Sequence, residues 1–239
     1  MTGEWVAWHR QYESDPTMAE RLRVVRSRIR EALDRAGPGP IRVVSACAGD
    51  GRDLLGVLAN HPRARDVRAR LVERTPDLAR AGAKGAKRLG LPSVRFRRGD
   101  ASNSSAYAGA VPADLVLLCG IFGNLRDADV RHTIRRVRGL CAANATVVWT
   151  RGRFAPDLTP KIRRWFAEEG FDELSFVTVP GSTKSVGAHR LVAPPRRYRR
   201  GVRLFTFLAR GQRPSDRAAG RTTPRPRRQR PERGRATDG

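Results

Sequence analysis

The sequence predicts an α/β fold in which a mostly parallel, doubly wound sheet is covered by helices on both faces. Short apolar strands alternate with helical stretches from residue 41 onward, an alternation typical of parallel sheets. The first strand also runs into a turn of small residues that opens directly into a helix. Two later strands predict an antiparallel pair at one edge, and a helical segment precedes the sheet.

Residues 1–40 form this N-terminal helical segment. Asp15 and Pro16 predict a helix start, because an Asp cap followed by Pro suits the first turn. The run Gly37–Pro40 predicts where the helix ends. Apolar residues recur between them at helical spacing: Leu22, Val25, Ile29 and Leu33.

An aromatic cluster lies ahead of that helix. Trp5, Trp8 and Tyr12 stand close together in a chain that is only 6% aromatic. They could anchor the segment to the core. Alternatively, they could form a lid over a ligand pocket, because aromatic rings can cover or stack on a substrate.

Residues 41–209 predict the sheet and its helices. Five apolar runs predict parallel strands: Ile41–Ala46, Ala69–Glu73, Val94–Arg97, Asp114–Cys119 and Thr146–Thr150. Four stretches between and after them predict helices: Asp53–Asn60, Pro76–Leu89, Asp127–Cys141 and Leu158–Glu169. The antiparallel pair is predicted at Glu173–Val179 and Arg203–Ala209, joined by a loop that includes Gly181–Gly201.

Residues 210–239 predict a disordered basic tail, because they hold ten arginines and very few apolar residues. The whole chain carries a formal net charge of +25. Charge spread so widely favours salt-sensitive attraction to nucleic acid without specifying it.

Composition also indicates a cytoplasmic protein. The N-terminus lacks a signal-peptide pattern, and the chain has no apolar run approaching the roughly 18 residues of a membrane span. The cysteines Cys47, Cys119 and Cys141 are odd in number and lack metal-ligand spacing, which fits a reducing compartment. The sequence does not determine an oligomeric state.

The turn after the first strand is the strongest functional signal. Ala48, Gly49 and Gly51 carry little or no side chain, so a ligand can approach the backbone closely. Glu73 ends the second predicted strand, 22 residues beyond Gly51. Ribose-binding carboxylates of nucleotide-binding βαβ units stand at about 20 residues. Together the turn and the acid indicate a nucleoside-containing cofactor.

These features resemble the class I S-adenosylmethionine-dependent methyltransferases, a Rossmann-like family, over roughly residues 41–209. The resemblance implies that the first turn holds the methionine part of S-adenosylmethionine and that Glu73 binds its ribose. It further implies that Asp100 contacts the adenine amino group and that residues 119–124 face the reacting methyl group. The implied cofactor-binding residues are Ser45, Ala46, Cys47, Ala48, Gly49, Gly51, Glu73, Arg74, Asp100, Ala101, Cys119, Gly120 and Asn124.

Two residues depart from the family pattern. Ser45 stands where an acid is usual, and Cys47 stands at the usual first glycine. A serine cannot balance the ammonium charge of the cofactor, whereas Asp50 or Asp53 could. Asp53 is equally explained as an acid that stabilises a helix N-terminus.

Other residues that the resemblance implies as cofactor contacts also have purely structural interpretations. Glu73 could be a solvated strand end, and Asp100 could cap the turn that follows it. Cys119 could be a small buried residue, which is how free cysteine usually behaves. Asn124 could be a turn residue.

Methyl transfer requires a general base only when the acceptor must lose a proton. His9 and His189 are weak candidates for that role on chemical grounds alone. The four histidines show no spacing for a metal site, so no metal is expected.

Three functions fit the sequence. The first is a methyltransferase for a small-molecule acceptor, in which residues 1–40 and the loop Gly181–Gly201 help to bind the acceptor. The second is an RNA-directed methyltransferase that uses the basic surface and tail. The third is a non-catalytic protein that binds nucleic acid or a nucleotide. A nicotinamide-dependent oxidoreductase is less favoured, since Leu54 occupies the third glycine position of the dinucleotide motif.

Overall fold

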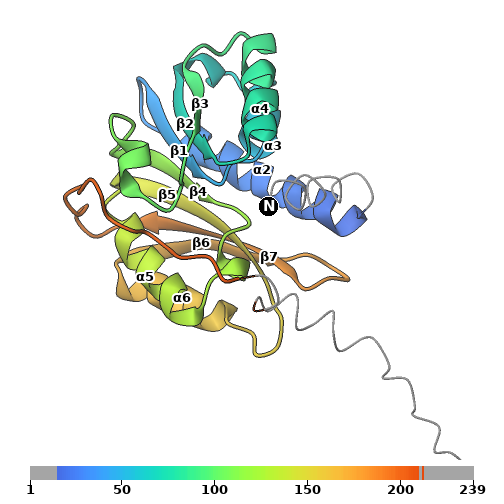
Figure 1. Ribbon diagram of the computed structural model, residues 1–239, viewed down its shortest axis with the longest axis vertical. Helices are drawn as coiled ribbons and strands as arrows, with labels where there is room; N and C mark the ends of the chain where they lie inside the picture. The colour runs from blue at the N-terminus through green and yellow to red at the C-terminus, as the bar shows by residue number, and fades with distance from the viewer. Residues whose placement is uncertain (1–14, 210–211, 213–239) are drawn as a thin grey trace, which may run out of the picture.

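The computed structural model describes residues 15–209 and residue 212. Its sheet has the strand order β3-β2-β1-β4-β5-β7-β6 (Figure 1). Strands β1 to β5 pair in parallel, while β7 runs antiparallel to both β5 and β6. The predicted class, a mostly parallel doubly wound sheet with an antiparallel C-terminal pair, is therefore confirmed.

The elements carry the labels of Figure 1. The strands are β1 (Ile41–Ala46), β2 (Val67–Glu73), β3 (Val94–Arg98), β4 (Ala113–Leu118), β5 (Cys141–Gly152), β6 (Phe171–Thr178) and β7 (Lys184–Leu191). The α-helices are α2 (Pro16–Arg35), α3 (Arg52–Leu58), α4 (Pro76–Arg88), α5 (Asp127–Val137) and α6 (Thr159–Glu168). Three short 3-10 helices are η1 (Ala64–Asp66), η2 (Ser104–Tyr107) and η3 (Phe122–Asn124).

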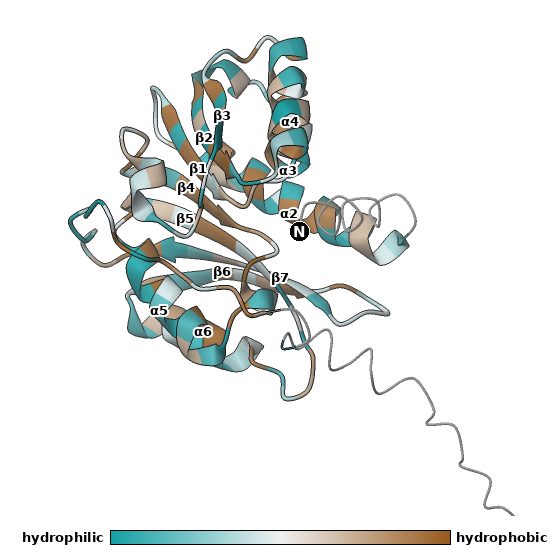
Figure 2. Ribbon diagram, viewed as in Figure 1, coloured by the Kyte–Doolittle hydropathy of each residue, from teal (hydrophilic) through white to brown (hydrophobic). Residues whose placement is uncertain are grey.

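Two apolar layers hold the sheet between its helices. Helices α2, α3 and α4 cover one face, and α5 and α6 cover the other (Figure 1). Apolar residues concentrate along the central strands, while the helices also carry hydrophilic residues (Figure 2). Helix α2 belongs to the first layer, because Ile29 and Leu33 are fully buried with Val43 of β1. Burial of such side chains is the dominant favourable term in folding.

The start of α2 follows the sequence prediction. Asp15 caps the helix by accepting from the Thr17 backbone N–H at 2.8 Å, and Pro16 occupies the first turn. Lys184 Nζ lies 3.0 Å from Asp15 Oδ2. This ion pair joins the beginning of α2 to the beginning of β7, which lies beside the carboxyl end of β5.

The predicted helix Asp127–Cys141 is too long. Helix α5 ends at Val137, and Cys141 is the first residue of β5. A tight turn separates them, in which Leu140 N donates to Val137 O at 2.8 Å. Leu140 O then accepts from Ala113 N at 2.8 Å. Pairing with β4 thus extends β5 well before the predicted start at residue 146.

The predicted strand Arg203–Ala209 is wrong. The last strand is β7, which lies inside the predicted loop Gly181–Gly201. Its buried polar residues hide it from a hydropathy pattern: Ser185 and His189 are 0% and 1% exposed. The segment after residue 201 instead crosses the molecule without forming a strand, and Leu204 N donates to Ser102 O at 2.7 Å.

Several expectations fall outside the described residues. The aromatic residues Trp5, Trp8 and Tyr12 and the candidate base His9 lie there, as does nearly all of the predicted tail 210–239. Among the described residues, no helix combines the length and hydrophobicity needed to cross a membrane.

Candidate functional site

The carboxyl ends of β1, β2 and β4 meet at one edge of the sheet, and the turn after β1 forms its centre. Ala48 N donates to Val72 O at 3.0 Å, which ties this turn to the end of β2. Gly49 and Gly51 have φ angles of +59° and +70°. Such left-handed conformations favour glycine, so the chain can curl directly from strand into helix.

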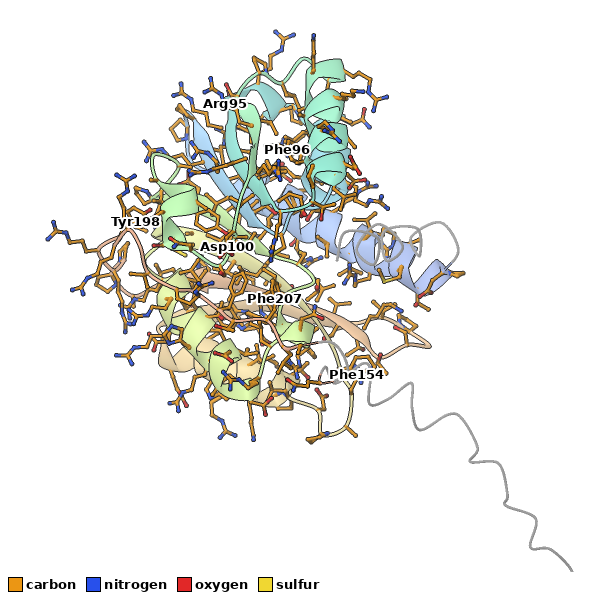
Figure 3. All side chains as sticks on the ribbon, viewed as in Figure 1. Arg95, Phe96, Asp100, Phe154, Tyr198 and Phe207 are labelled. Carbon is orange, nitrogen blue, oxygen red and sulfur yellow. The ribbon has the colours of Figure 1, made fainter. Side chains whose placement is uncertain are left out.

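Packing accounts for Gly51 without any ligand. A Cβ atom at this position would lie 2.6 Å from Phe96 Cζ and 2.9 Å from Leu71 Cδ2. Phe96 projects from β3 into the space between the strands and α4 (Figure 3). Gly82 of α4 accommodates the same ring. The glycine pattern therefore serves helix–strand packing as well as any close approach by a ligand.

Cys47 keeps the backbone geometry of a glycine. Its φ is +53°, a left-handed conformation that is uncommon for residues with a side chain. Its side chain packs against the core, together with the buried Ala46 and Ala101. Burial raises the pKa of the Cys47 thiol, and the charges of Glu73 and Asp100 raise it further. The thiol is therefore protonated at neutral pH and is not a nucleophile.

Glu73 joins the first turn to the end of β2. Its Oε2 accepts from Gly49 N at 2.8 Å, and its Oε1 accepts from Thr75 N at 2.7 Å. Its exposed fraction is only 7%. A carboxylate can accept about four hydrogen bonds, so both oxygens retain acceptor capacity. The sequence interpretation of Glu73 as a solvated strand end is wrong.

Asp100 lies after β3 and is more exposed. Its Oδ1 accepts from Ser102 N at 2.9 Å and from Ser102 Oγ at 2.6 Å. Its Oδ2 lies 3.2 Å from Arg203 Nη1. Partial burial alone would raise the pKa of Asp100, but the Ser102 hydrogen bonds and the charges of Arg203 and Arg74 outweigh it and lower the pKa. Asp100 therefore caps its turn and also presents a stable negative charge.

The end of β4 is braced by hydrogen bonds. Gly120 N donates to Thr150 Oγ1 at 2.8 Å, and Gly120 O accepts from Asn124 Nδ2 at 2.8 Å. Asn124 thus has the turn role that was one of its two interpretations. Cys119 packs against the first apolar layer, the one beneath α2, α3 and α4, and burial raises the pKa of its thiol.

Opposite charges lie close to the first turn. Asp53, 9% exposed, accepts from Leu54 N at 2.8 Å, and burial raises its pKa. Arg21, 8% exposed, reaches Thr150 Oγ1 at 3.4 Å, and its charge acts on Asp53. Asp50 pairs with Arg52 at 2.7 Å. Ser45, at the usual acid position, is only 2% exposed within β1.

His189 does not lie at this edge. It is 1% exposed, and its Nδ1 accepts from Trp149 Nε1 at 3.1 Å. The Phe166 ring of α6 stacks on it with a centroid distance of 4.3 Å. Burial lowers the pKa of His189 to about 4, partly opposed by the charge of Glu173. This placement gives His189 a role in the core rather than as a general base.

The sequence pattern missed three residues of the site: Arg21, Thr150 and Arg203. Arg21 and Thr150 are 129 residues apart, and Arg203 is 103 residues from Asp100. Separations of this size leave no local signal. Only the position of Arg21 on the buried face of the predicted helix could have indicated an unusual arginine.

No metal site is evident at this edge. Across residues 15–209 and 212, no three His, Cys, Asp or Glu side chains gather in a way that could hold a metal ion.

No protein-family model and no curated protein sequence matches this chain. Solved structures do match. Magnesium protoporphyrin IX methyltransferase from Synechocystis, with bound S-adenosylmethionine, aligns with a TM-score of 0.61 at 12% identity, over 79% of this chain and 91% of that one. A 1,6-didemethyltoxoflavin-N1-methyltransferase from Burkholderia thailandensis, with bound S-adenosylhomocysteine, aligns with a TM-score of 0.57 at 17% identity, over 81% and 91%. The chain has the fold of these proteins.

Proposed function

We propose that this protein is an S-adenosylmethionine-dependent methyltransferase that acts on a small-molecule acceptor. The observation that carries the proposal is a hydrogen bond between the acid and the first turn. The Glu73 carboxylate, at the end of β2, accepts from Gly49 N in that turn. The turn and the acid are the two features that indicated a nucleoside-containing cofactor, and here they are in direct contact. The fold supports the same function, since structures that share it hold this cofactor or its demethylated product.

The residues present fit the polar groups of S-adenosylmethionine. Glu73 would accept hydrogen bonds from the ribose hydroxyls with its remaining lone pairs. Asp100 would accept from the adenine amino group, while Arg203 holds its other oxygen. Asp53 and Arg21 offer opposite charges near the first turn, which complement an amino acid that carries both an ammonium and a carboxylate. The Asp53 carboxylate would thus balance the ammonium charge of the cofactor, which Ser45 cannot do.

The departure at Cys47 does not disturb the turn. Because Cys47 adopts a left-handed conformation, the backbone follows the path that a glycine would allow. Its thiol packs against the core. We therefore expect Cys47 to cost some stability through its strained conformation and to leave the backbone available to the cofactor.

The cofactor, when bound, supplies a sulfonium methyl group, which is already a strong electrophile. The protein's part is to hold donor and acceptor in line and to exclude water. The braced turn from Gly120 to Asn124 would form a rigid wall beside the transferred group. His189 lies in the core and is not in a position to act as a base.

A segment outside the cofactor-binding domain is proposed to form part of the acceptor pocket. The first described residue, Asp15, is tied to Lys184 beside the carboxyl end of β5. Residues 1–14 therefore join the described chain close to the proposed site. We propose that they complete the acceptor pocket, with residues 41–209 as the cofactor-binding domain, residues 210–239 as a basic tail, and the cytoplasm as the location.

The Glu73→Ala variant tests the cofactor assignment by calorimetry. Loss of hydrogen bonds to a charged group should weaken S-adenosylmethionine binding by about 1.5–3 kcal/mol, roughly ten- to a hundredfold. Glu73→Gln keeps one acceptor oxygen and should lose less. Asp172→Ala, an acid on the edge strand β6, serves as a matched control and should bind normally.

Because Glu73 also holds Gly49 and Thr75, thermal unfolding of each variant must accompany the calorimetry. A folded Glu73→Ala protein that binds the cofactor as tightly as the wild type would remove the central contact of the proposal. Failure of the wild type to bind either S-adenosylmethionine or S-adenosylhomocysteine would overturn the proposed function itself.

A further inference from the structure

The first three strands carry five arginines on one face of the sheet. Arg42 pairs in register with Arg68, and Arg70 pairs with Arg95. In a parallel sheet, residues in register on neighbouring strands point to the same side, as do residues two apart along one strand. Arg97 follows Arg95 by two positions. These five residues, Arg42, Arg68, Arg70, Arg95 and Arg97, are called the arginine face below.

This face is open because β3 and β4 are not joined by an α-helix. Helices α3 and α4 pack on the opposite side of these strands, against Val43, Leu71 and Val94. On the arginine side, the connection consists of η2 and a short loop. Between this loop and the strands lies a groove of about 440 Å³. Its lining includes Arg42, Arg68, Arg70 and Arg95 with Gly109 to Val111.

The arginines divide into two sets. Arg70 and Arg97 donate to backbone carbonyls of η2 and the residue after it, at 3.3–3.4 Å, and so hold that connection in place. In the described part of the chain, no carboxylate forms an ion pair with Arg42, Arg68 or Arg95. The Asp114 carboxylate contacts the backbone of Arg42 rather than its guanidinium group, since it accepts from Arg42 N at 2.7 Å.

Positive charges as close together as these are stabilised by a bound anion. Neighbouring strands are about 4.8 Å apart and alternate residues about 6.8 Å apart, so the guanidinium groups repel one another unless they are screened. Guanidinium groups bind phosphate with paired hydrogen bonds. The arginine face is thus suited to several phosphate groups at once.

The positive surface continues beyond the groove. Ser104 of η2 holds the loop that follows β7, since its Oγ donates to Arg199 O at 2.7 Å and its O accepts from Tyr198 Oη at 2.8 Å. Arg199 and Arg200 in this loop are exposed. Figure 3 labels Arg95 and Tyr198, one on β3 and the other on the loop after β7. Ser105 joins the two parts, since its O accepts from Arg97 Nη1 at 3.3 Å and its Oγ accepts from Gly201 N at 2.9 Å. The positive charge therefore extends beyond the groove.

We propose that the arginine face docks the phosphodiester backbone of a single-stranded nucleic acid. A positively charged groove that follows the backbone is the general solution for binding single strands without sequence preference. The open, elongated positive surface favours a strand over a compact oligophosphate. Arg68 lies five residues before Glu73, roughly 16 Å along β2. Arg97, at the other end of the face, is in register with Val72, the residue before Glu73. The groove that Arg42, Arg68 and Arg95 line therefore begins away from the proposed methyl-transfer site, and the inference does not rest on the proposed function.

Fluorescence anisotropy with a labelled single-stranded RNA dodecamer tests the proposal in the full-length protein. The double variant Arg68→Gln/Arg95→Gln removes two exposed charges from the face. It should weaken binding roughly tenfold or more. It should also reduce the slope of log affinity against log salt by about 1.4, the value for two phosphate contacts on a single strand.

The matched control is Arg30→Gln/Arg164→Gln, which removes two exposed charges from α2 and α6. It should change both quantities much less, and both doubles should keep the wild-type melting temperature. An equal loss of RNA binding in the two doubles would overturn the proposal, because charge alone would then explain it. Binding of tripolyphosphate that only the Arg68/Arg95 double loses, with RNA binding unchanged, would also overturn it in favour of a small oligophosphate.

Discussion

The two halves of the sheet differ in where their charged and polar side chains lie. In the half formed by β3, β2 and β1, charged groups stand at strand ends or on an open face, as Glu73 and Arg68 do. In the half formed by β5, β7 and β6, several polar groups are enclosed, as His189 is beneath α6, while Asp172 and Arg190 at the edge remain exposed. One half is therefore equipped to meet ligands. The other uses polar groups to specify a core.

The enclosed half depends on an aromatic cluster around Trp149. Its Nε1 donates to His189, and its ring lies 6.1 Å from that of Phe166 and 5.7 Å from that of Phe122. Gly187 of β7 allows this, because a Cβ there would lie 2.6 Å from Trp149 Nε1. A buried tryptophan needs an acceptor for its N–H. His189 meets that need only in its neutral form.

The largest expected effect tests whether His189 is a core residue. Its pKa falls from 6.5 to about 4 on folding, so the unfolded chain binds the extra proton between these values. The free energy of unfolding should have its full value above pH 6.5. It should decrease as the pH falls toward 4, by on the order of 3 kcal/mol. Urea unfolding at several pH values measures this loss.

His189→Gln should flatten that pH dependence, since glutamine does not titrate. The control His132→Gln changes an exposed histidine on α5 and should retain the wild-type slope. Equal slopes in wild type and His189→Gln would place the acid sensitivity elsewhere in the molecule.

The second effect tests packing in the open half. Gly51→Ala would force a Cβ within 2.6 Å of Phe96 Cζ, in addition to the cost of a left-handed alanine. Gly90→Ala has a similar φ of +66° and nothing within 4 Å of the added atom. We expect Gly51→Ala to destabilise the protein by about 2 kcal/mol more than Gly90→Ala. If the two variants unfold alike while only Gly51→Ala weakens cofactor binding, the glycine serves the ligand rather than the packing.

The smallest effect concerns the junction between the halves, where Asp15 links α2 to Lys184 of β7. The Thr17 hydroxyl, the largest cause, and Lys184 lower the pKa of Asp15 to about 2. The contribution of Asp15 to the free energy of unfolding should be present above pH 4 and lost as the pH falls through 2. Because the side chain is 37% exposed, solvent screening keeps the ionic part small.

Asp15→Ala should therefore cost about 1 kcal/mol, mainly through loss of the helix cap. Asp15→Asn keeps a capping oxygen and removes the charge, so it should lose only part of this. An Asn variant as unstable as the Ala variant would show that the ion pair, not the cap, joins the two halves.

The two halves also differ in how well the sequence predicts them. Strand β1 is predicted to the residue, and β2, β3 and β4 within one or two residues at each end. In the other half, β7 is absent from the prediction and β5 is much too short. The first set has apolar residues in short runs or at alternate positions, which is a local pattern. The second contains a serine, a glycine and a histidine whose burial depends on residues far away in the chain.

The sequence by itself determined the strand–helix alternation, the start of α2 at Asp15 and Pro16, and the turn with Gly49 and Gly51. These follow from local chemistry: apolar runs, helix caps and residues that tolerate positive φ. It also placed Glu73 at the end of its strand. The order of such elements along the chain was enough to indicate a cofactor-binding fold.

Only the tertiary structure decided which side chains meet. It placed Arg203 on Asp100, buried His189 under Phe166, and set Arg68 and Arg95 on one open face. These outcomes depend on strand register and on contacts between residues from about 20 to more than 100 positions apart. A hydropathy pattern carries no information about such pairings, because a shift of one residue would turn each side chain to the opposite face.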